Sequence, residues 1–270
     1  MARGDFARVP CAIAGAEAIE ADTRHAFGRH THDQFGIGLI LRGAQHSHSG
    51  RGRVEAGAGD LITVNPGEVH DGAPIGDAGR QWCILYVEPA LVAHAIADIV
   101  EGRHGWREFA RPVIRDTTLA QGFRRLYAAA TAPPAGAATP GRESLLLALL
   151  ASSLDLPRSR PPSAVPAAIA QARALIDDDP AAPVSLADLA CASGLSRFQV
   201  LRGFSQATGM TPHAYQVQRR VALARRLIRL GATLTDAAIA SGFADQSHMT
   251  RVFVRLYGLT PGVYAGPSRA

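Results

Sequence analysis

The sequence contains no lysine, and all 28 of its basic residues are arginine. Arginine suits phosphate and guanine recognition, but its use along the whole chain favours a GC-rich genome as the explanation. The three cysteines, Cys11, Cys83 and Cys191, are far apart, and their spacing excludes a disulfide framework or a thiolate metal site. No apolar run approaches the roughly 20 residues of a membrane helix, and no signal-peptide pattern is present. These absences predict a cytoplasmic protein with reduced thiols and no membrane partner.

Positive charge is concentrated in the second half of the chain. Residues 1–160 hold 17 arginines and 17 acidic residues, so their net charge is zero. Residues 161–270 hold 11 arginines and 6 aspartates, a net charge of +5. From Ser193 onward there are 10 arginines against Asp236 and Asp245, a net charge of +8. This asymmetry predicts that the C-terminal region binds a polyanion.

A segment near the end of the chain occurs twice. Leu186–Gly194 returns 48 residues later as Leu234–Gly242. After the glycine the match continues at an offset of 49 residues, through the pairs Phe204 and Phe253, Gly209 and Gly258, Pro212 and Pro261, and Tyr215 and Tyr264. Each copy predicts a short helix, a turn at glycine and a second helix. That is the helix-turn-helix arrangement, whose second helix enters the major groove of DNA.

The signals for the ends of the two second helices are strong. In the first repeat, Ser196 is a good N-cap for the second helix and Gly209 is expected to end it. In the second repeat, Asp245 is the N-cap and Gly258 ends the helix. The two units are joined by a helix expected over residues 212–230, which would span about 28 Å. Because one turn of B-DNA measures about 34 Å, the two helices are expected in successive grooves of double-stranded DNA.

The polar faces of these helices supply candidate base contacts. Arginine pairs with guanine and glutamine with adenine through two hydrogen bonds, which points to Arg202, Arg251 and Gln246. Phe198 and Leu201 are suited to packing on thymine methyl groups. Phosphate contacts are expected from Arg197, Arg219, Arg220 and Arg255. The alternative is a solvated basic face that contacts nothing.

These residues carry a family resemblance. Residues 166–267 resemble the DNA-binding module of the AraC/XylS family of bacterial transcription regulators, most clearly over Ala238–Phe243, Ser247–Phe253 and Gly258–Pro261. The resemblance implies a transcription regulator, more often an activator, with RNA polymerase as a further partner. It implies base contacts at Phe198, Leu201, Arg202, Gln246, Ser247, His248, Thr250 and Arg251. Gly203 is unusual inside such a helix and should cost about 1 kcal/mol relative to alanine.

The N-terminal half has a different pattern. Short apolar runs separated by glycine-rich turns predict β-strands over residues 24–87, in an antiparallel barrel or sandwich. Helices are expected over residues 91–100, 118–130 and 142–154. The leucine-rich run 145–150 packs either on its own barrel or in a helix-pair interface, and we expect the interface and therefore a homodimer.

The resulting fold class is α+β with two domains. We expect residues 1–156 to form an antiparallel β-barrel with a helical dimerisation segment, and the Pro- and Ser-rich residues 157–165 to form a linker. Residues 166–270 form an all-α domain with two helix-turn-helix units.

Residues 24–87 also resemble the cupin barrel. His30 and His32, followed by Gly59, Gly67 and His70, resemble its two motifs, but Gly36 stands where the metal-binding glutamate is expected. The three histidines could hold a transition metal or line the pocket of an organic ligand. Because the carboxylate is missing, we expect no metal cofactor. The effector pocket is expected to be lined by His30, His32, Arg42, His70, Trp82 and Tyr86, with Asp71 as a further candidate.

We therefore expect a transcription regulator, an activator by resemblance, controlled by a small molecule bound in the barrel. One alternative is a metal-dependent cupin enzyme fused to a DNA-binding module. The other is a constitutive DNA-binding protein whose barrel only dimerises. The sequence has neither a G-x-S-x-G elbow nor a phosphate loop, so it predicts no catalytic residue and no enzyme.

Overall fold

The computed structural model describes residues 5–99, 107–132, 141–154 and 166–266 of the chain. The chain divides into two compact units, Met1–Arg158 with Gly266–Ala270, and Ser159–Ala265. The division falls within residues 157–165, the expected linker, which lies outside the described residues. In the described part of the chain, no helix combines the length and apolar character needed to cross a bilayer.

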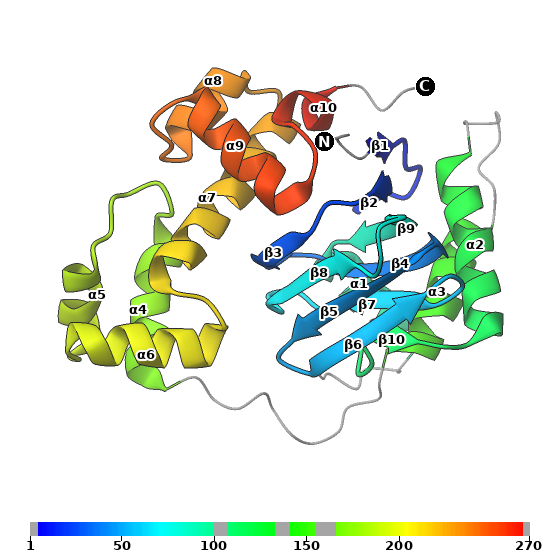
Figure 1. Cartoon of the computed structure of the whole chain (residues 1–270), viewed down its shortest axis with the longest axis horizontal. Coiled ribbons are helices and arrows are strands. Elements are labelled where there is room, and N and C mark those ends of the chain that lie inside the picture. The colour runs from blue at the N-terminus through cyan, green and yellow to red at the C-terminus, as the bar shows by residue number, and fades with distance from the viewer. Residues whose placement is uncertain (1–4, 100–106, 133–140, 155–165, 267–270) are drawn as a thin grey trace. The chain divides into compact units, whose positions relative to one another are not determined.

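The first unit is built from two antiparallel sheets (Figure 1). The larger has the order β1-β2-β9-β4-β7-β10 and the smaller the order β3-β8-β5-β6. The strands are β1 (Asp5–Val9), β2 (Ala16–Thr23), β3 (Phe27–His30), β4 (Phe35–Arg42), β5 (Ala44–Ser49), β6 (Gly52–Gly57), β7 (Leu61–Val64), β8 (His70–Pro74), β9 (Arg80–Val87) and β10 (Val113–Ile114). The expected antiparallel β domain is confirmed, although its strands form two sheets rather than one closed ring.

The β structure begins earlier than the sequence pattern indicated. β2 has the sequence AEAIEADT, in which alanine and acidic residues have low strand preference. It is a strand because it pairs with β9 along its whole length, from Ala16 with Val87 to Thr23 with Arg80. The short edge strand β1 then pairs with β2. Pairing with a strand that is distant in the sequence therefore decides this part of the fold, and the local sequence pattern does not predict it.

The central strands of the larger sheet are buried on both faces. On β9, Cys83, Leu85 and Val87 belong to one hydrophobic cluster, whereas Trp82 and Ile84 belong to another. The alternation of side chains along a strand separates the two sets. The first set faces the helices of the unit and the second faces the smaller sheet. All three cysteines are free thiols, as expected, and burial raises the pKa of Cys83 to about 12.

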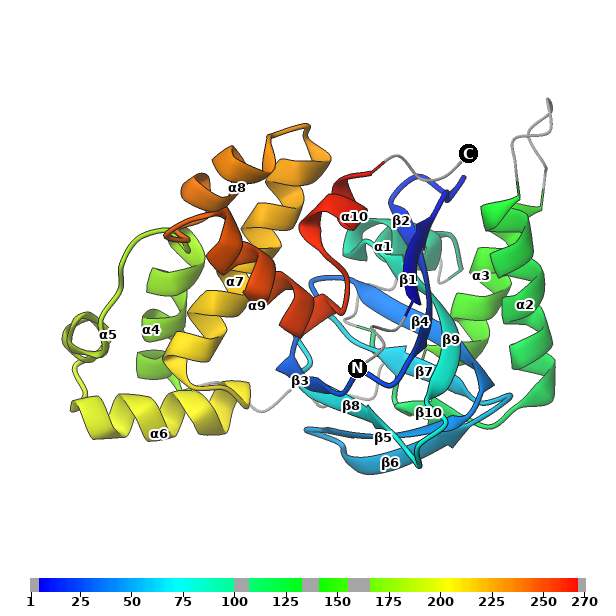
Figure 2. The same cartoon turned by 45° about the horizontal axis from the view of Figure 1, so that its top comes forward.

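Helices cover the outer face of the larger sheet. They are α1 (Pro89–Ile99), α2 (Thr117–Thr131) and α3 (Arg142–Ser153), and α2 and α3 lie side by side in both views (Figure 1, Figure 2). Leu146, Leu149 and Leu150 of α3 are buried in the same core as Phe123 and Leu126 of α2. Leu145 and Leu147 also pack against this core. The leucine run is thus used inside its own unit, and the homodimer prediction loses the surface on which it was based.

The second unit is entirely helical. Its helices are α4 (Ala167–Asp178), α5 (Leu186–Ser193), α6 (Arg197–Thr208), α7 (Pro212–Arg229), α8 (Leu234–Ala240), α9 (Gln246–Tyr257) and α10 (Pro261–Ala265). The pairs α5–α6 and α8–α9 are the two helix-turn-helix units, and α7 connects them (Figure 2). The all-α domain expected from the repeat is confirmed. Its core includes Val200 and Phe204 of α6 and Met249 and Phe253 of α9.

Candidate functional site

Helix α6 has one buried face and one exposed face. It begins at a capping box, in which Ser196 Oγ accepts from Gln199 N at 3.3 Å and Gln199 Oε1 accepts from Ser196 N at 2.9 Å. Val200 and Phe204 are fully buried. The four predicted contacts of this helix, Arg197, Phe198, Leu201 and Arg202, are all exposed. Phe198 is 70% exposed and Leu201 is 40% exposed, so this face presents two large apolar side chains beside its arginines.

Helix α9 repeats this arrangement. The Asp245 side chain caps it by accepting from His248 N at 2.6 Å. Met249, Val252, Phe253 and Leu256 form the buried face. The other face carries exposed Gln246, Ser247, Arg251 and Arg255, with His248 and Thr250 half-buried at its border. The structure therefore brings the predicted residues of each helix onto one outward face.

Two residues of this face are held by their own domain. Gln246 Oε1 accepts from Thr235 Oγ1 of α8 at 3.0 Å. The His248 ring meets Phe243 edge-on, with 5.2 Å between centroids. These contacts fix both side chains at the start of α9, where residues of a helix in the major groove reach the base edges.

Two arginines of the connecting helix α7 form contacts within their own domain. Arg219 Nε forms an ion pair with Asp177 Oδ1 at 2.9 Å. Arg220 donates to the carbonyl oxygens of Pro180, Ala181 and Ala182 at 2.9–3.2 Å. Both guanidinium groups tie α7 to the end of α4 and the loop after it. Their expected role as phosphate contacts stays a prediction.

In the first unit, the three predicted histidines meet. His30 ends β3 and pairs across the sheet with His70, which begins β8. The ring centroids are 4.3 Å apart for His30 and His70, 4.9 Å for His30 and His32, and 5.2 Å for His32 and His70. One ring nitrogen from each residue lies within 4.8 Å of the other two. The sequence identified this cluster correctly.

Backbone carbonyls determine the tautomers of two of these rings. His30 Nδ1 lies 2.7 Å from Gly28 O, and His70 Nδ1 lies 3.0 Å from Glu68 O. A carbonyl oxygen only accepts, so each Nδ1 carries the proton and each Nε2 carries the lone pair of the neutral ring. Burial, and secondarily the neighbouring His70, lowers the pKa of His30 to about 3. Burial also lowers the pKa of His70, so both rings are neutral near pH 7.

Tyr86 reaches the cluster from the larger sheet. Its ring centroid lies 4.6 Å from that of His32, and its hydroxyl lies 3.4 Å from His32 Nε2. Tyr86 pairs across the sheet with Gly36 of β4. A Cβ at Gly36 would lie 3.2 Å from Tyr86 Cε1. The tyrosine ring therefore occupies the space beside the position where the sequence lacks the expected glutamate.

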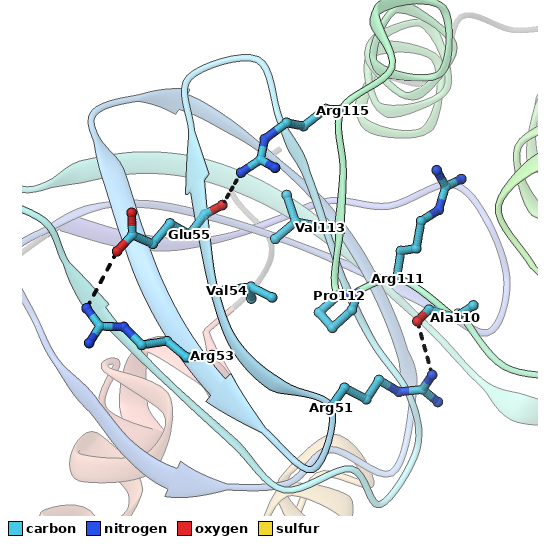
Figure 3. A pocket seen from close by; sticks show the side chains of 9 residues that line it. All are labelled: Arg51, Arg53, Val54, Glu55, Ala110, Arg111, Pro112, Val113 and Arg115. Atoms are coloured by element: carbon cyan, nitrogen blue, oxygen red, sulfur yellow. Dashed lines mark hydrogen bonds and ion pairs between the residues drawn. The ribbon is translucent and has the colours of Figure 1, made fainter.

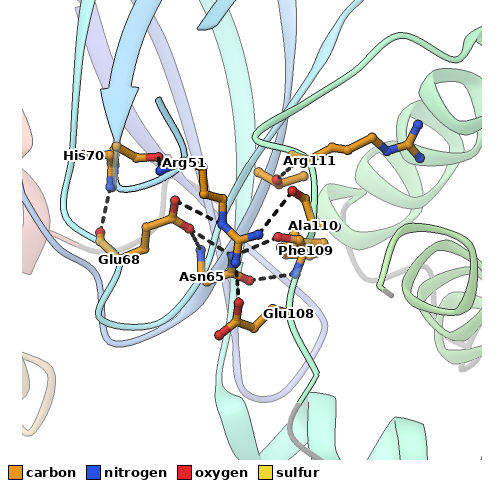
Figure 4. Close-up of polar contacts among 10 residues, drawn as sticks. Arg51, Asn65, Glu68, His70, Glu108, Phe109, Ala110 and Arg111 are labelled. Atoms are coloured by element: carbon orange, nitrogen blue, oxygen red, sulfur yellow. Dashed lines mark hydrogen bonds and ion pairs between the residues drawn. The ribbon is translucent and has the colours of Figure 1, made fainter. Parts of the chain in front are cut away.

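A hydrogen-bond network supports the loop that carries His70 (Figure 4). Buried Asn65 donates to Glu68 Oε2 at 2.9 Å and to Phe109 O at 3.1 Å, and its Oδ1 accepts from Phe109 N at 2.8 Å. Arg51 forms ion pairs with Glu68, at 3.5 Å, and with Glu108. Gly67 N donates to His32 O at 2.7 Å. This loop is thus anchored on both sides, which fixes the positions of His32 and His70.

The other predicted pocket residues separate into two groups. Trp82 is buried between the sheets beside Ile40 and Ile84, in the same space as Tyr86. Arg42 does not join them, because it is exposed at the end of β4, where it pairs with Asp22 at 2.6 Å. Asp71 accepts from the backbone N of His48 at 2.7 Å. The expectation that Arg42 lines the pocket is therefore wrong.

Arg80 is a buried charged residue that was not identified from the sequence. Arg80 is 1% exposed and donates to Gln45 Oε1 at 2.8 Å, His25 O at 3.0 Å and Gly72 O at 3.3 Å. Burial lowers its pKa to about 10. The alternation of side chains along β9 could have identified it. Arg80 is two residues before Trp82 on the same strand, so both side chains point between the sheets.

A separate hollow lies between β6 and the segment that contains β10 (Figure 3). It has a volume of about 460 Å³ and is lined by Arg51, Arg53, Val54, Glu55, Ala110, Arg111, Pro112, Val113 and Arg115. Its arginines are largely engaged by internal acceptors: Arg51 bonds Ala110 O at 3.1 Å, Arg53 pairs with Glu55 at 3.5 Å, and Arg115 bonds Glu55 O at 2.7 Å. No predicted effector residue lines it, and we assign it no function.

Comparison with known proteins identifies both units. The model of the AraC-like ligand-binding domain matches residues 14–150, half of the chain. A helix-turn-helix domain model matches residues 189–266, which include α6 and α9. The chain belongs to the AraC family of transcriptional regulators. The chain thus combines a ligand-binding domain with a DNA-binding domain, as an effector-controlled regulator of transcription does.

AraC family relatives match over most of the chain. The HTH-type transcriptional regulator YbfI of Bacillus subtilis is 29% identical over 230 residues, which cover 83% of this chain and 81% of YbfI. The HTH-type transcriptional activator RhaR of Klebsiella pneumoniae is 28% identical over 273 residues, covering 97% of this chain and 95% of RhaR. The crystal structure of an apo ToxT variant from Vibrio cholerae has a TM-score of 0.60 at 14% identity, covering 94% of this chain and 97% of that chain, which shows that the fold is shared.

Proposed function

We propose that this AraC family protein reads its operator with the exposed faces of α6 and α9. The observation that carries the proposal is that ten of the twelve predicted DNA-contact residues lie on α6 and α9, and none of these ten is fully buried. Helix α7, with 18 residues, is about 27 Å long and separates the two reading helices by nearly one turn of DNA. Arg202 and Arg251 are the proposed guanine contacts, and Arg197 and Arg255 the proposed phosphate contacts.

Selection of bound duplexes from a random library tests the reading residues. Wild-type protein defines the preferred site, and Arg202→Ala, Arg251→Ala and Arg226→Ala are then compared on it. Arg226 is the matched control, because it is an exposed arginine of α7 and its loss removes the same charge. Each reading variant should lose about 1–3 kcal/mol of discrimination at one base pair, whereas Arg226→Ala should leave the preferences unchanged. Unaltered preferences in Arg202→Ala and Arg251→Ala would refute the proposed base contacts.

We further propose that the effector binds between the two sheets of the first unit, where His30, His32, His70, Trp82 and Tyr86 gather. A solved ToxT structure contains an unsaturated fatty acid, which supports ligand binding by a protein of this fold. Thermal unfolding of the full chain with a panel of small molecules tests this. A ligand at 100 times its dissociation constant should stabilise its domain by about 2.7 kcal/mol. Ligands that stabilise Trp82→Ala equally would place the site elsewhere.

The regulatory outcome is proposed by analogy. RhaR is an activator, and we propose activation here too, with RNA polymerase as a partner in the cytoplasm. Since the relatives are regulators, we propose that the first unit senses its ligand without turning it over. The homodimer stays a prediction, and the mass of the protein in solution, with and without DNA, tests it. A monomer bound to one site would contradict it.

A further inference from the structure

Two imidazoles of the smaller sheet, the imidazole of His32 in the loop after β3, and the Tyr86 phenol of the larger sheet lie close together. We propose that His30, His32 and His70 bind a late first-row divalent metal ion, with Zn²⁺ as the representative, and that the Tyr86 hydroxyl lies beside it as an oxygen donor. The site belongs to the proposed sensor domain and so deepens the proposed function. It rests on that function only for its regulatory meaning, because ion binding is measured without DNA.

The spacing of the donor atoms suits a single ion. Nitrogen atoms bound tetrahedrally to Zn²⁺ at about 2.0–2.1 Å lie about 3.4 Å apart. The three histidine nitrogens are within 4.8 Å of one another, so side-chain rotations of about one ångström bring them to the required spacing. The Tyr86 hydroxyl and His32 Nε2 are 3.4 Å apart, which is already the separation of two ligands on one tetrahedral ion.

The hydrogen bonds around the rings fit metal ligation. His30 and His70 donate from Nδ1 to the carbonyls of Gly28 and Glu68. Each therefore presents the lone pair of Nε2, and its ring orientation is fixed by the carbonyl, as is usual for metal-binding histidines. His32 is held at its backbone oxygen by Gly67 N. The rings of His30 and His70 are thus oriented by the backbone before an ion arrives.

The donor chemistry selects the class of ion. Imidazole suits Zn²⁺, Cu²⁺, Ni²⁺ and Fe²⁺, whereas Mg²⁺ and Ca²⁺ require mainly oxygen ligands. The sequence led us to expect no metal because Gly36 stands in place of a carboxylate, but the Tyr86 ring lies next to that position, 3.2 Å from the Cβ that Gly36 lacks. The proposed site therefore departs from the expectation drawn from the sequence. Three protein nitrogens leave at least one coordination position for Tyr86, water or an oxygen donor of an organic effector. The ion would thereby give the sensor domain a fixed point at which an effector carboxylate or hydroxyl binds.

Calorimetric titration of the full-length, chelator-stripped protein with Zn²⁺ tests the proposal. Wild type should bind one equivalent per chain, and His32→Ala and His70→Ala should each bind at least about 100-fold more weakly, the upper end of the loss seen when a metal site loses a supporting residue. His48→Ala is the matched control, because His48 lies on the neighbouring strand β5 and is exposed. It should keep wild-type affinity. Tyr86→Phe should weaken binding by a smaller factor than either histidine variant.

The folded state of each variant is checked by its unfolding midpoint without metal, and His70→Gln replaces His70→Ala if the alanine variant does not fold. Equal Zn²⁺ affinity in wild type and both histidine variants would overturn the site, as would absence of binding by folded wild type. DNA affinity with and without Zn²⁺ is measured separately. An ion that binds at the triad without changing DNA affinity would leave the metal site standing and count against its regulatory role alone.

Discussion

The ring of Tyr86 lies over Gly36, its cross-strand neighbour, so closely that a Cβ on the glycine would be 3.2 Å from Tyr86 Cε1 and 3.3 Å from Ile84 Cδ1. Two residues further along β4, Gly38 is tighter still: its Cβ would lie 2.8 Å from the carbonyl oxygen of Cys83. The two glycines of β4 make room for the side chains of β9 that fill the space between the sheets. A larger side chain on β4 would compete directly with Tyr86.

Alanine at these two positions should have unequal effects. Gly36→Ala meets movable side-chain atoms and should destabilise the first unit by about 1 kcal/mol, whereas Gly38→Ala meets backbone and should cost about 2–3 kcal/mol. Tryptophan fluorescence during urea unfolding measures both, because the two tryptophans of the sequence, Trp82 and Trp106, both precede the linker and Trp82 lies next to Ile84 on β9. Equal losses would show that β4 and β9 move apart freely.

Acid should destabilise the first unit through His30. Burial lowers its pKa from the ordinary value near 6.5 to about 3. Above about pH 6.5 both folded and unfolded states are neutral and the full stability is present. As the pH falls toward 3, the unfolded chain binds a proton first, and stability falls by up to about 1.4 kcal/mol per pH unit. His70, whose pKa is also lowered, adds to this loss.

Urea unfolding of the metal-free protein at pH values between about 7 and 5 measures the slope, before most carboxylates titrate. His30→Gln should reduce the dependence of the unfolding free energy on pH by about 1.4 kcal/mol per pH unit, which corresponds to one bound proton. His48→Gln should leave this dependence unchanged. An unchanged slope in His30→Gln would mean that the ring is protonated in the folded state.

Asn65 should be a structural anchor of the His70 loop. Asn65→Ala leaves the buried N–H and C=O of Phe109 without their side-chain partner, which should cost about 2–4 kcal/mol. The control is Glu68→Gln, which keeps the shape of the side chain and removes a partly exposed ion pair with Arg51. That change should cost less than about 1 kcal/mol. Similar losses in the two variants would place the anchor in the ion pair rather than in the amide.

Local signals were predicted well from the sequence. Ser196 and Asp245 cap their helices and Gly209 and Gly258 end them as expected, because a cap depends on neighbours only three residues away. The histidine cluster was found because its three members carry a recognisable spacing. By contrast, the engagement of Arg219 by Asp177 depends on how α7 packs against α4. The two residues are 42 positions apart in the sequence, so the periodicity of one helix cannot predict their contact.

The unexpected glycine of α6 has the same kind of long-range cause. A Cβ on Gly203 would lie 2.8 Å from Ile169 Cδ1 and 3.2 Å from its Cγ1, on the neighbouring helix α4. Ile169 is fully buried and has little room to move. The sequence indicated only the loss of helix propensity, about 1 kcal/mol. The close approach of α4 explains why that loss is accepted in a DNA-reading helix.

A double-mutant cycle between these two residues follows. Gly203→Ala gains about 1 kcal/mol of helix propensity but overpacks the contact at a cost of about 1–3 kcal/mol, so it should be neutral or destabilising. Ile169→Val removes the Cδ1 atom that obstructs the new methyl group. In that background Gly203→Ala should become stabilising, with a coupling of about 1–2 kcal/mol between the sites. Urea unfolding followed by far-ultraviolet circular dichroism measures all four proteins, and an identical effect of Gly203→Ala in both backgrounds would mean that the α4–α6 contact does not select the glycine.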